Sequence, residues 1–291
     1  MREEISRRIL AVRSQEPERI ARLAATRRRA DTLFGPHGRM MIIAADHPAR
    51  GSFRAGNRDQ AMADRLDLLD RLCTALARPG VNGVLATPDI VEDLLILGAL
   101  DGKVVIGSMN RGGIAGASFE IDDRFTAYTA EAIAAAGFDG GKMLLRIDPD
   151  DPATARALES CGRAVTELAE RRLLAMVEPF IAHRVDGRVR NELTPDAMVR
   201  AVAIASGLGV TSAYTWLKIP IVPDLERVLA ATTLPTLILG GEVSGDQDAM
   251  FTRWAKALAL PTVRGLVIGR ALLYPPDDDV AAAVDTAVSL L

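Results

Sequence analysis

From residue 40 to its end, the chain alternates between short apolar runs and longer amphipathic stretches. The apolar runs, rich in Val, Ile and Leu, lie at 40–45, 81–86, 104–106, 143–147, 173–177, 214–219, 236–239 and 266–268. Helical periodicity covers 60–77, 89–99, 124–136, 152–171, 194–207, 223–231, 246–259 and 278–290. Continuous apolar runs are typical of parallel strands buried on both faces. Eight of them separated by helices predict an α/β protein with a single (β/α)8 TIM barrel.

An open, doubly wound sheet is the alternative for such an alternation. That fold would place a glycine-rich phosphate turn after the first strand. The turn at residues 46–51 reads Asp-His-Pro-Ala-Arg-Gly and has no G-x-G-x-x-G pattern. Dinucleotide binding is therefore not favoured.

Residues 1–37 predict a helical extension that precedes a barrel domain over 38–291. Apolar positions such as Ile5, Ile9 and Leu23 recur among many arginines there. The run Arg27-Arg28-Arg29 is a candidate phosphate or RNA patch. The net charge of −3 favours a solvated face instead.

Composition narrows the class of protein further. The chain has 291 residues, 49% of them hydrophobic and 25% charged, which is typical of a globular protein. No apolar run reaches membrane-spanning length, and the charged start does not resemble a signal sequence. With two distant cysteines, we expect a cytoplasmic protein with neither nucleic acid nor a membrane as partner.

Active sites of barrel enzymes form where the strands end. The polar residues and glycines at these ends are Asp46, His47, Ser108, Asn110, Arg111, Lys142, Arg146, Asp148, Glu178, Lys218, Gly240, Gly241, Gly269 and Arg270. Arginines number 31 and lysines four, and two of the four lysines fall on predicted strands. A strand lysine inside a barrel requires a partner or a function.

Lys142, Glu178 and Lys218 are spaced 36 and 40 residues apart, about one βα unit each. Adjacent strands would therefore present Lys, Glu and Lys in order around the barrel rim. Burial of Lys218 among apolar neighbours disfavours its charged form, and a neutral amine can attack a carbonyl to form a Schiff base. A buried ion pair between Lys142 and Glu178 is an equally good interpretation of the spacing alone.

The loops after the last two strands predict a phosphate site. Gly240 and Gly241 allow close backbone approach, and Ser244 could cap a helix that starts near Gly245. Gly269 and Arg270 would open another short helix with an arginine near the same anion. Arg146, at the end of the fourth strand, is a further candidate for substrate binding.

Two further possibilities concern Asp46 and the histidines. Asp46 could position a substrate hydroxyl or relay a proton, or it could simply cap the following helix or pair with Arg50. A metal site built from Asp46, His47, Glu178 and His183 can be drawn. These residues lack a diagnostic ligand spacing, so we expect no metal.

In their order along the chain, these residues resemble the class I, Schiff-base aldolases of the deoxyribose-phosphate aldolase superfamily. The first-strand Asp46-His47 is similar to a signature of archaeal-type fructose-bisphosphate aldolases. The Lys142, Glu178 and Lys218 series is similar to tagatose-bisphosphate aldolases, in which the sixth-strand lysine forms the imine. A glycine-rich loop at strand seven and a Gly-Arg at strand eight also match those relatives.

The resemblance covers residues from about 38 to 275 and extends to an actinobacterial aldolase-like group encoded beside inositol-catabolism genes. Two departures concern the archaeal-type enzymes, which have a fourth-strand tyrosine at the position of Lys142 and a different sequence after Asp46-His47. The resemblance implies a homo-oligomeric lyase that needs no metal or organic cofactor.

The implied reaction is reversible aldol cleavage of a phosphorylated ketose or keto-acid. Lys218 would form the Schiff base, Glu178 would move protons, Lys142 would tune Lys218, and Asp46 would position a hydroxyl. The phosphate would lie at Gly240, Gly241, Ser244, Gly269 and Arg270. Acyl transfer from a phosphorylated dione and a non-catalytic sugar-phosphate sensor are the alternatives.

Overall fold

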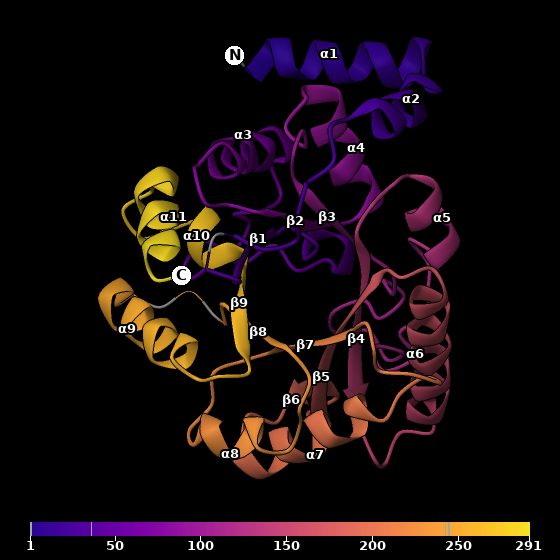
Figure 1. Ribbon diagram of the computed structural model, residues 1–291, viewed down its shortest axis with the longest axis vertical. Helices are drawn as coiled ribbons and strands as arrows, with labels where there is room; N and C mark the ends of the chain where they lie inside the picture. Colours follow the sequence, from indigo (N-terminus) through magenta and orange to yellow (C-terminus); the bar gives the residue numbers. More distant parts are fainter. Residues whose placement is uncertain (1, 36, 242, 244) are drawn as a thin grey trace.

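The computed structural model describes residues 2–35, 37–241, 243 and 245–291. Its strands are β1 (Met40–Ala44), β2 (Gly83–Ala86), β3 (Val104–Ser108), β4 (Gly140–Ile147), β5 (Leu174–Val185), β6 (Arg188–Asn191), β7 (Thr215–Ile219), β8 (Thr236–Leu239) and β9 (Val263–Ile268). All except β6 are parallel neighbours, and the pairing of β4 with β5 closes the ring. The predicted eight-stranded TIM barrel is confirmed (Figure 1).

Helices surround the barrel. They are α1 (Arg2–Gln15), α2 (Arg19–Thr26), the 3-10 helix η1 (Pro48–Arg50), α3 (Arg65–Leu76), α4 (Pro88–Leu97), α5 (Ala130–Ala135), α6 (Ala153–Glu170), α7 (Pro195–Ser206), α8 (Leu225–Leu229), α9 (Gln247–Leu258), α10 (Arg270–Leu273) and α11 (Val280–Ser289). Two of them, α3 and α5, begin about five residues later than the sequence pattern predicts, because Asp64 caps α3 and Thr129 caps α5.

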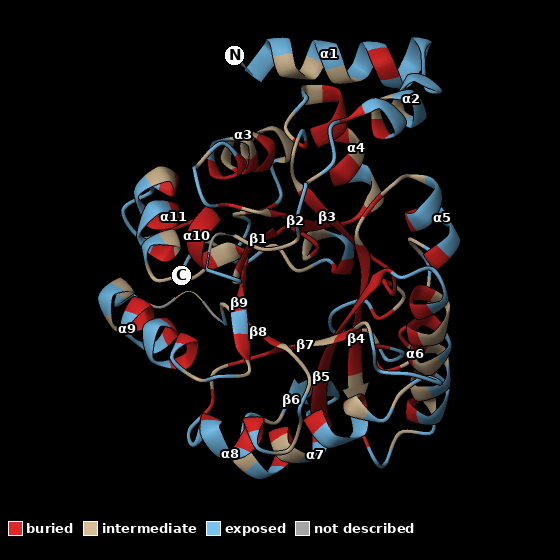
Figure 2. Ribbon diagram, viewed as in Figure 1, coloured by how far each residue is buried: buried red, intermediate tan, exposed pale blue. Residues whose placement is uncertain are grey.

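The two faces of each strand pack against different layers. On β1, Met40 and Ile42 belong to the cluster inside the barrel, whereas Met41 and Ile43 pack in the layer beneath the helices. Figure 2 shows buried residues along the strands and exposed ones on the outer helix surfaces. Because side chains alternate along a strand, every second residue continues into the barrel at its carboxyl end.

The amino-terminal segment closes the end of the barrel at which the strands begin. Helices α1 and α2 pack on α4, and the chain then passes beneath the strands, where Phe34 contacts Trp216 of β7 with ring centroids 5.5 Å apart. This contact fills the interior where the strands begin. The division into domains at residue 37 stays a prediction.

Arg27 corrects one expectation, since it does not belong to a solvated face. Its side chain is 2% exposed and donates hydrogen bonds to the carbonyls of Lys103 and Gly137 at 2.9 Å. It also lies 3.7 Å from Asp139 and over the Phe138 ring. The partly buried carbonyls at the strand starts gain a charged donor in this way, whereas the adjacent Arg28 and Arg29 are exposed.

β5 continues well beyond the barrel, which the sequence pattern did not predict. Residues 182–185 pair antiparallel with β6 to form a hairpin, in a stretch where the apolar runs predict no strand. Asp186 and Gly187, both with positive φ, make its two-residue turn. This hairpin stands at the edge of the cavity described next.

Candidate active site

A cavity of about 440 Å³ opens where the barrel strands end. Its lining includes polar residues and glycines contributed by seven of the eight barrel strands or the loops after them: Asp46, Arg111, Lys142, Arg146, Glu178, Lys218, Gly240, Gly241, Gly269 and Arg270. Ser244 lies outside the described residues. The other residues predicted to act in catalysis or phosphate binding all line this one cavity. Its described lining does not include Ser108, Asn110, Asp148 or His183.

Strand alternation explains why the charged side chains point inward. Met176 of β5 faces the barrel interior, so Glu178, two residues later, also faces inward. Trp216 packs against the same interior cluster, and Lys218 follows it by two residues. The register places Lys142 beside Met176, one layer deeper than Glu178.

Glu178 lies between the two lysines. Lys218 Nζ donates to Glu178 Oε1 at 2.8 Å, and Lys142 Nζ lies 2.5 Å from Glu178 Oε2. All three side chains are buried, and they come from the consecutive barrel strands β4, β5 and β7. The predicted order Lys, Glu, Lys around the barrel is therefore present, and Lys142 is deep in the barrel.

Asp46 extends this cluster to β1. Its Oδ2 lies 3.0 Å from Lys142 Nζ and accepts hydrogen bonds from Ser108 Oγ and Arg111 Nη1 at 3.2 and 3.1 Å. Arg111 also donates to the Asp46 carbonyl. The alternative pairing of Asp46 with Arg50 does not occur.

Arg50 instead anchors the loop that carries Arg111. It pairs with Asp123 at 2.6 Å and donates to the carbonyls of Asn110 and Gly113. These contacts hold the start of the segment between β3 and α5 against the first strand. Arg111 was among the strand-end residues, but its contact with Asp46 depends on the path of this loop, which no spacing in the sequence indicates.

The pKa values follow from burial and these contacts. Burial alone would raise the pKa of Glu178, but the two lysine charges outweigh it and hold the pKa at about 2. Lys142 and Arg111 likewise keep the pKa of Asp46 well below its ordinary value despite burial. Burial lowers the pKa of Lys142, helped by the charges of Lys218 and Arg111 and opposed by the two carboxylates.

His47 stands beside this cluster with a neutral ring. Burial lowers its pKa, although its Nδ1 lies 3.9 Å from Oδ1 of Asp46. His183, the other histidine of the possible metal site, instead contacts Glu192 across the hairpin at 3.0 Å. Among the described residues, no group of three His, Cys, Asp or Glu side chains is placed to hold a metal.

The predicted phosphate loops border the cavity beside β1. Gly269 is required by close packing, because a Cβ atom there would lie 2.4 Å from the Ala44 carbonyl oxygen. Gly241 has a φ of +68°, which favours glycine. Arg270 is the first residue of α10, as expected.

One detail of the predicted anion site, the start of the helix after β8, is wrong. Helix α9 begins at Gln247, and its cap is Asp246, whose side chain accepts from the Ala249 amide. The helix therefore begins two residues later than the predicted start near Gly245. An aspartate at the cap places negative charge at this helix terminus.

Arg146 projects into the cavity from the end of β4. Its Nη1 lies 2.8 Å from Oε1 of Glu120, a buried residue of the loop after β3. Arg146 is thus placed to contact a substrate, and it also ties that loop to β4.

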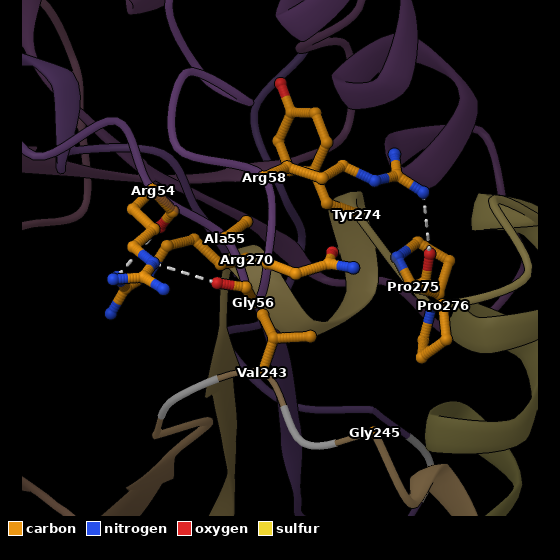
Figure 3. Close-up of a pocket in the computed structure, with 11 residues that line it drawn as sticks. Arg54, Ala55, Gly56, Arg58, Val243, Gly245, Arg270, Tyr274, Pro275 and Pro276 are labelled. Carbon is orange, nitrogen blue, oxygen red and sulfur yellow. Dashed lines mark hydrogen bonds between the residues drawn. The ribbon is translucent and has the colours of Figure 1, made fainter.

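A second cavity, of about 520 Å³, adjoins the first and shares Arg270 with it (Figure 3). Arg270 donates to the Arg54 carbonyl at 3.1 Å. The two other arginines that line it already have carboxylate partners. Arg58 lies 2.7 Å from Asp278, and Arg54 lies 3.4 Å from Asp59.

The chain is a TIM barrel with a charged cavity at the carboxyl ends of its strands. Its fold, though not the cavity, can be compared with those of several aldolases of known structure. It belongs to the Cgl0159-like family, whose model matches residues 38–288. The crystal structure of Cgl0159 from Corynebacterium glutamicum (Brevibacterium flavum) is 51% identical, covers 99% of this chain and 96% of that one, and has a TM-score of 0.96.

More distant structures share the fold. A Schiff-base-forming fructose-1,6-bisphosphate aldolase is 19% identical over 93% of this chain and 99% of that one, with a TM-score of 0.61. An archaeal fructose-1,6-bisphosphate aldolase, whose catalytic lysine is bound to a carbinolamine intermediate, is 18% identical over 93% and 98%, with a TM-score of 0.63. No curated protein matches the sequence. None of the helices in the described ranges has the length and apolar character to cross a bilayer.

Proposed function

We propose that this chain is a class I aldolase that cleaves a phosphorylated ketose or keto-acid through a Schiff base on Lys218. The observation that carries the proposal is the buried contact of Glu178 with both Lys142 and Lys218 at the strand ends. A carboxylate between two amines supplies a nucleophile and a proton carrier in one place. The shared fold with Schiff-base aldolases supports the same reaction class.

The reaction begins with attack of the Lys218 amine on the substrate carbonyl carbon. Glu178, ionised in the free site, takes the proton that the new C–N bond releases from nitrogen. The carbonyl oxygen takes a proton from the Lys142 ammonium group and becomes the carbinolamine hydroxyl. Glu178 then returns its own proton to that hydroxyl, which leaves as water and gives an iminium ion. Both proton transfers of Glu178 use Oε1, which already contacts Lys218 Nζ.

Cleavage follows at the bond between the α and β carbons of the iminium. A base removes the β-hydroxyl proton, the C–C bond breaks, and its electron pair moves into the enamine. Asp46 is suited to hold or deprotonate that hydroxyl, because Lys142 and Arg111 keep it ionised. Protonation and hydrolysis of the enamine then restore the Lys218 amine.

Lys142 has two further roles in this scheme. Its ammonium group keeps Glu178 ionised beside Lys218, ready to accept the proton from nitrogen. From its position deeper in the barrel than Glu178, it can also donate hydrogen bonds to substrate oxygens. Gly240, Gly241, Gly269 and Arg270 would hold the phosphate across the cavity, with Arg146 near the other end of the substrate.

A substrate screen tests the reaction. Ketose mono- and bisphosphates and deoxy-keto-gluconate phosphates would be incubated with the wild type, Lys218→Met and Lys256→Met. Lys256 is exposed on α9 and serves as the matched control. We expect cleavage that is lost in Lys218→Met and kept in Lys256→Met, whereas equal cleavage by all three would reject the assignment.

Three finer expectations accompany the proposal. We expect a homo-oligomer, which light scattering would measure, and a cytoplasmic enzyme, which cell fractionation would test. Kinship with the aldolase-like group beside inositol-catabolism genes predicts such genes next to this one. Each expectation can fail without affecting the assignment of Lys218.

A further inference from the structure

Five charged side chains meet at the floor of the cavity, and their charges do not balance. Arg111, Lys142 and Lys218 are cationic when protonated, and they face the carboxylates of Asp46 and Glu178. All five are buried, with exposed fractions of 8% or less. Three positive charges against two negative ones leave an excess of one, which burial disfavours.

The charged residues around this cluster do not remove the excess. Arg50 pairs with Asp123, and Arg146 pairs with Glu120, so each pair contributes no net charge. His47 carries no charge at neutral pH. The other described charged residues that line the cavity, Arg190 and Arg270, carry no negative charge that could offset the excess.

Release of one proton makes the cluster neutral, and the residue types determine which group can release it. A guanidinium keeps its proton at any accessible pH, whereas a buried ammonium group loses one readily. The proton must therefore leave a lysine. Since both lysines contact Glu178, the two amines act as one coupled pair.

We propose that Arg111 is the fixed positive charge that drives one proton out of the Lys142–Lys218 pair, so that the free site already holds a neutral amine. Arg111 is a positioning residue, because it acts through Asp46 and Lys142 rather than on the substrate. The inference rests on the proposed aldolase function and explains how its nucleophile is prepared. The lowered pKa of Lys142 is in accord with it.

Lys218 can become the neutral amine of the pair without exchange of protons with solvent. If Lys218 holds the proton, Glu178 accepts it on Oε1, the carboxyl group rotates to bring that O–H to Lys142, and the neutral Lys142 takes the same proton. The result is a neutral Lys218, a protonated Lys142 and an ionised Glu178, so the number of protons is unchanged. The 2.8 and 2.5 Å contacts supply the path.

Competitive acetylation of the lysines without substrate tests the proposal. The wild-type protein would be labelled with acetic anhydride from pH 6 to 11, and peptide mass spectrometry would compare Lys142 and Lys218 with the exposed Lys256. We expect one amine of the pair to react with a midpoint below that of Lys256. In Arg111→Gln, this midpoint should rise by about one unit or more, which is tenfold less neutral amine at pH 7.

Two further variants separate charge from structure. Asp46→Asn removes a negative charge, so the midpoint should fall, opposite to Arg111→Gln. Arg124→Gln, an exposed arginine of the same loop, should leave it unchanged. A folded Arg111→Gln protein with a wild-type midpoint would overturn the proposal. If that variant does not fold, an unchanged midpoint in Asp46→Asn overturns it instead, and a lowered one supports it.

Labelling does not require turnover, so its outcome is independent of the aldolase assignment. If Arg111→Gln leaves the labelling midpoint unchanged and the wild-type enzyme forms the imine, only the proposed role of Arg111 is rejected. If Arg111→Gln shifts the labelling midpoint but the wild-type protein never forms an imine, the aldolase function is rejected and the effect of the Arg111 charge still holds.

Discussion

Lys142 and Lys218 are joined through opposite oxygens of one buried carboxylate, Glu178. Each amine thus stabilises the ionised carboxylate, and the carboxylate can accept a proton from either. This arrangement makes Glu178 the acid and base of the proposed reaction. It also makes the stability of the site dependent on pH.

Glu178→Gln should slow the reaction without preventing binding. The amide can accept a hydrogen bond from Lys218 but cannot carry a proton, so the steps that form the carbinolamine and release water lose their acid and base. We expect kcat to fall by about 10²- to 10⁴-fold with a smaller change in KM. Single-turnover kinetics on the best substrate of the screen would measure it, and a kcat within twofold of wild type would contradict the role.

Acid should destabilise the protein through the same residue. The folded-state pKa of Glu178, about 2, lies below the ordinary value, so its contribution is fully present above about pH 4 to 5. That contribution is lost as the pH falls toward 2. Urea unfolding at pH 5, 4 and 3 should show a smaller loss of stability for Glu178→Gln than for wild type. Equal losses would show that Glu178 does not contribute.

Arg270→Gln should weaken recognition of phosphate specifically. A charge-assisted hydrogen bond to an anion contributes about 1.5–3 kcal/mol, so KM for a phosphorylated substrate should rise about 10- to 100-fold. An unphosphorylated analogue should show no such change. Arg54→Gln, whose side chain points into the adjoining cavity, is the matched control (Figure 3). A similar KM change for both substrates would place the phosphate elsewhere.

EDTA should leave activity unchanged. Ammonium and guanidinium groups already contact the oxygens of Asp46 and Glu178, and these cations supply the charge that a metal would bring. Assays after dialysis against the chelator, with and without added Zn²⁺ or Mn²⁺, measure this. Loss of activity that metal restores would favour the metal-dependent alternative.

The contacts of Arg27 where the strands begin predict that Arg27 contributes more to the stability of the protein than the neighbouring Arg28. Arg27→Gln removes the charged donor from two partly buried carbonyls and leaves Asp139 with less compensation, so unfolding should cost about 2–4 kcal/mol less. Arg28→Gln changes an exposed side chain and should have little effect. Denaturant unfolding compares the two, and equal stability would show that the Arg27 contacts contribute nothing.

The barrel and the lysine series could be predicted because both depend on regular spacing. Parallel strands one βα unit apart bring their ends to one edge, so Lys142, Glu178 and Lys218 follow from counting residues. Arg111 and Arg27 are different. The contacts of Arg111 depend on an irregular loop, and those of Arg27 depend mainly on backbone carbonyls that a sequence does not distinguish.

The hairpin of β5 and β6 also could not be predicted from the pattern of apolar residues. His183 and Arg184 interrupt the apolar run of β5, so residues 182–185 resemble a loop although they continue the strand. Their pairing is with β6 rather than with another barrel strand, and outside the barrel a strand need not be apolar on both faces.

Borohydride trapping tests the assignment of Lys218 most directly. The enzyme would be reduced in the presence of a cleavable ketose phosphate, digested and mapped by mass spectrometry, with the other three lysines as internal controls. The account predicts a substrate-dependent adduct on Lys218 that is absent from Lys218→Met. An adduct on Lys142 instead, or active enzyme that yields no adduct at all, would contradict it.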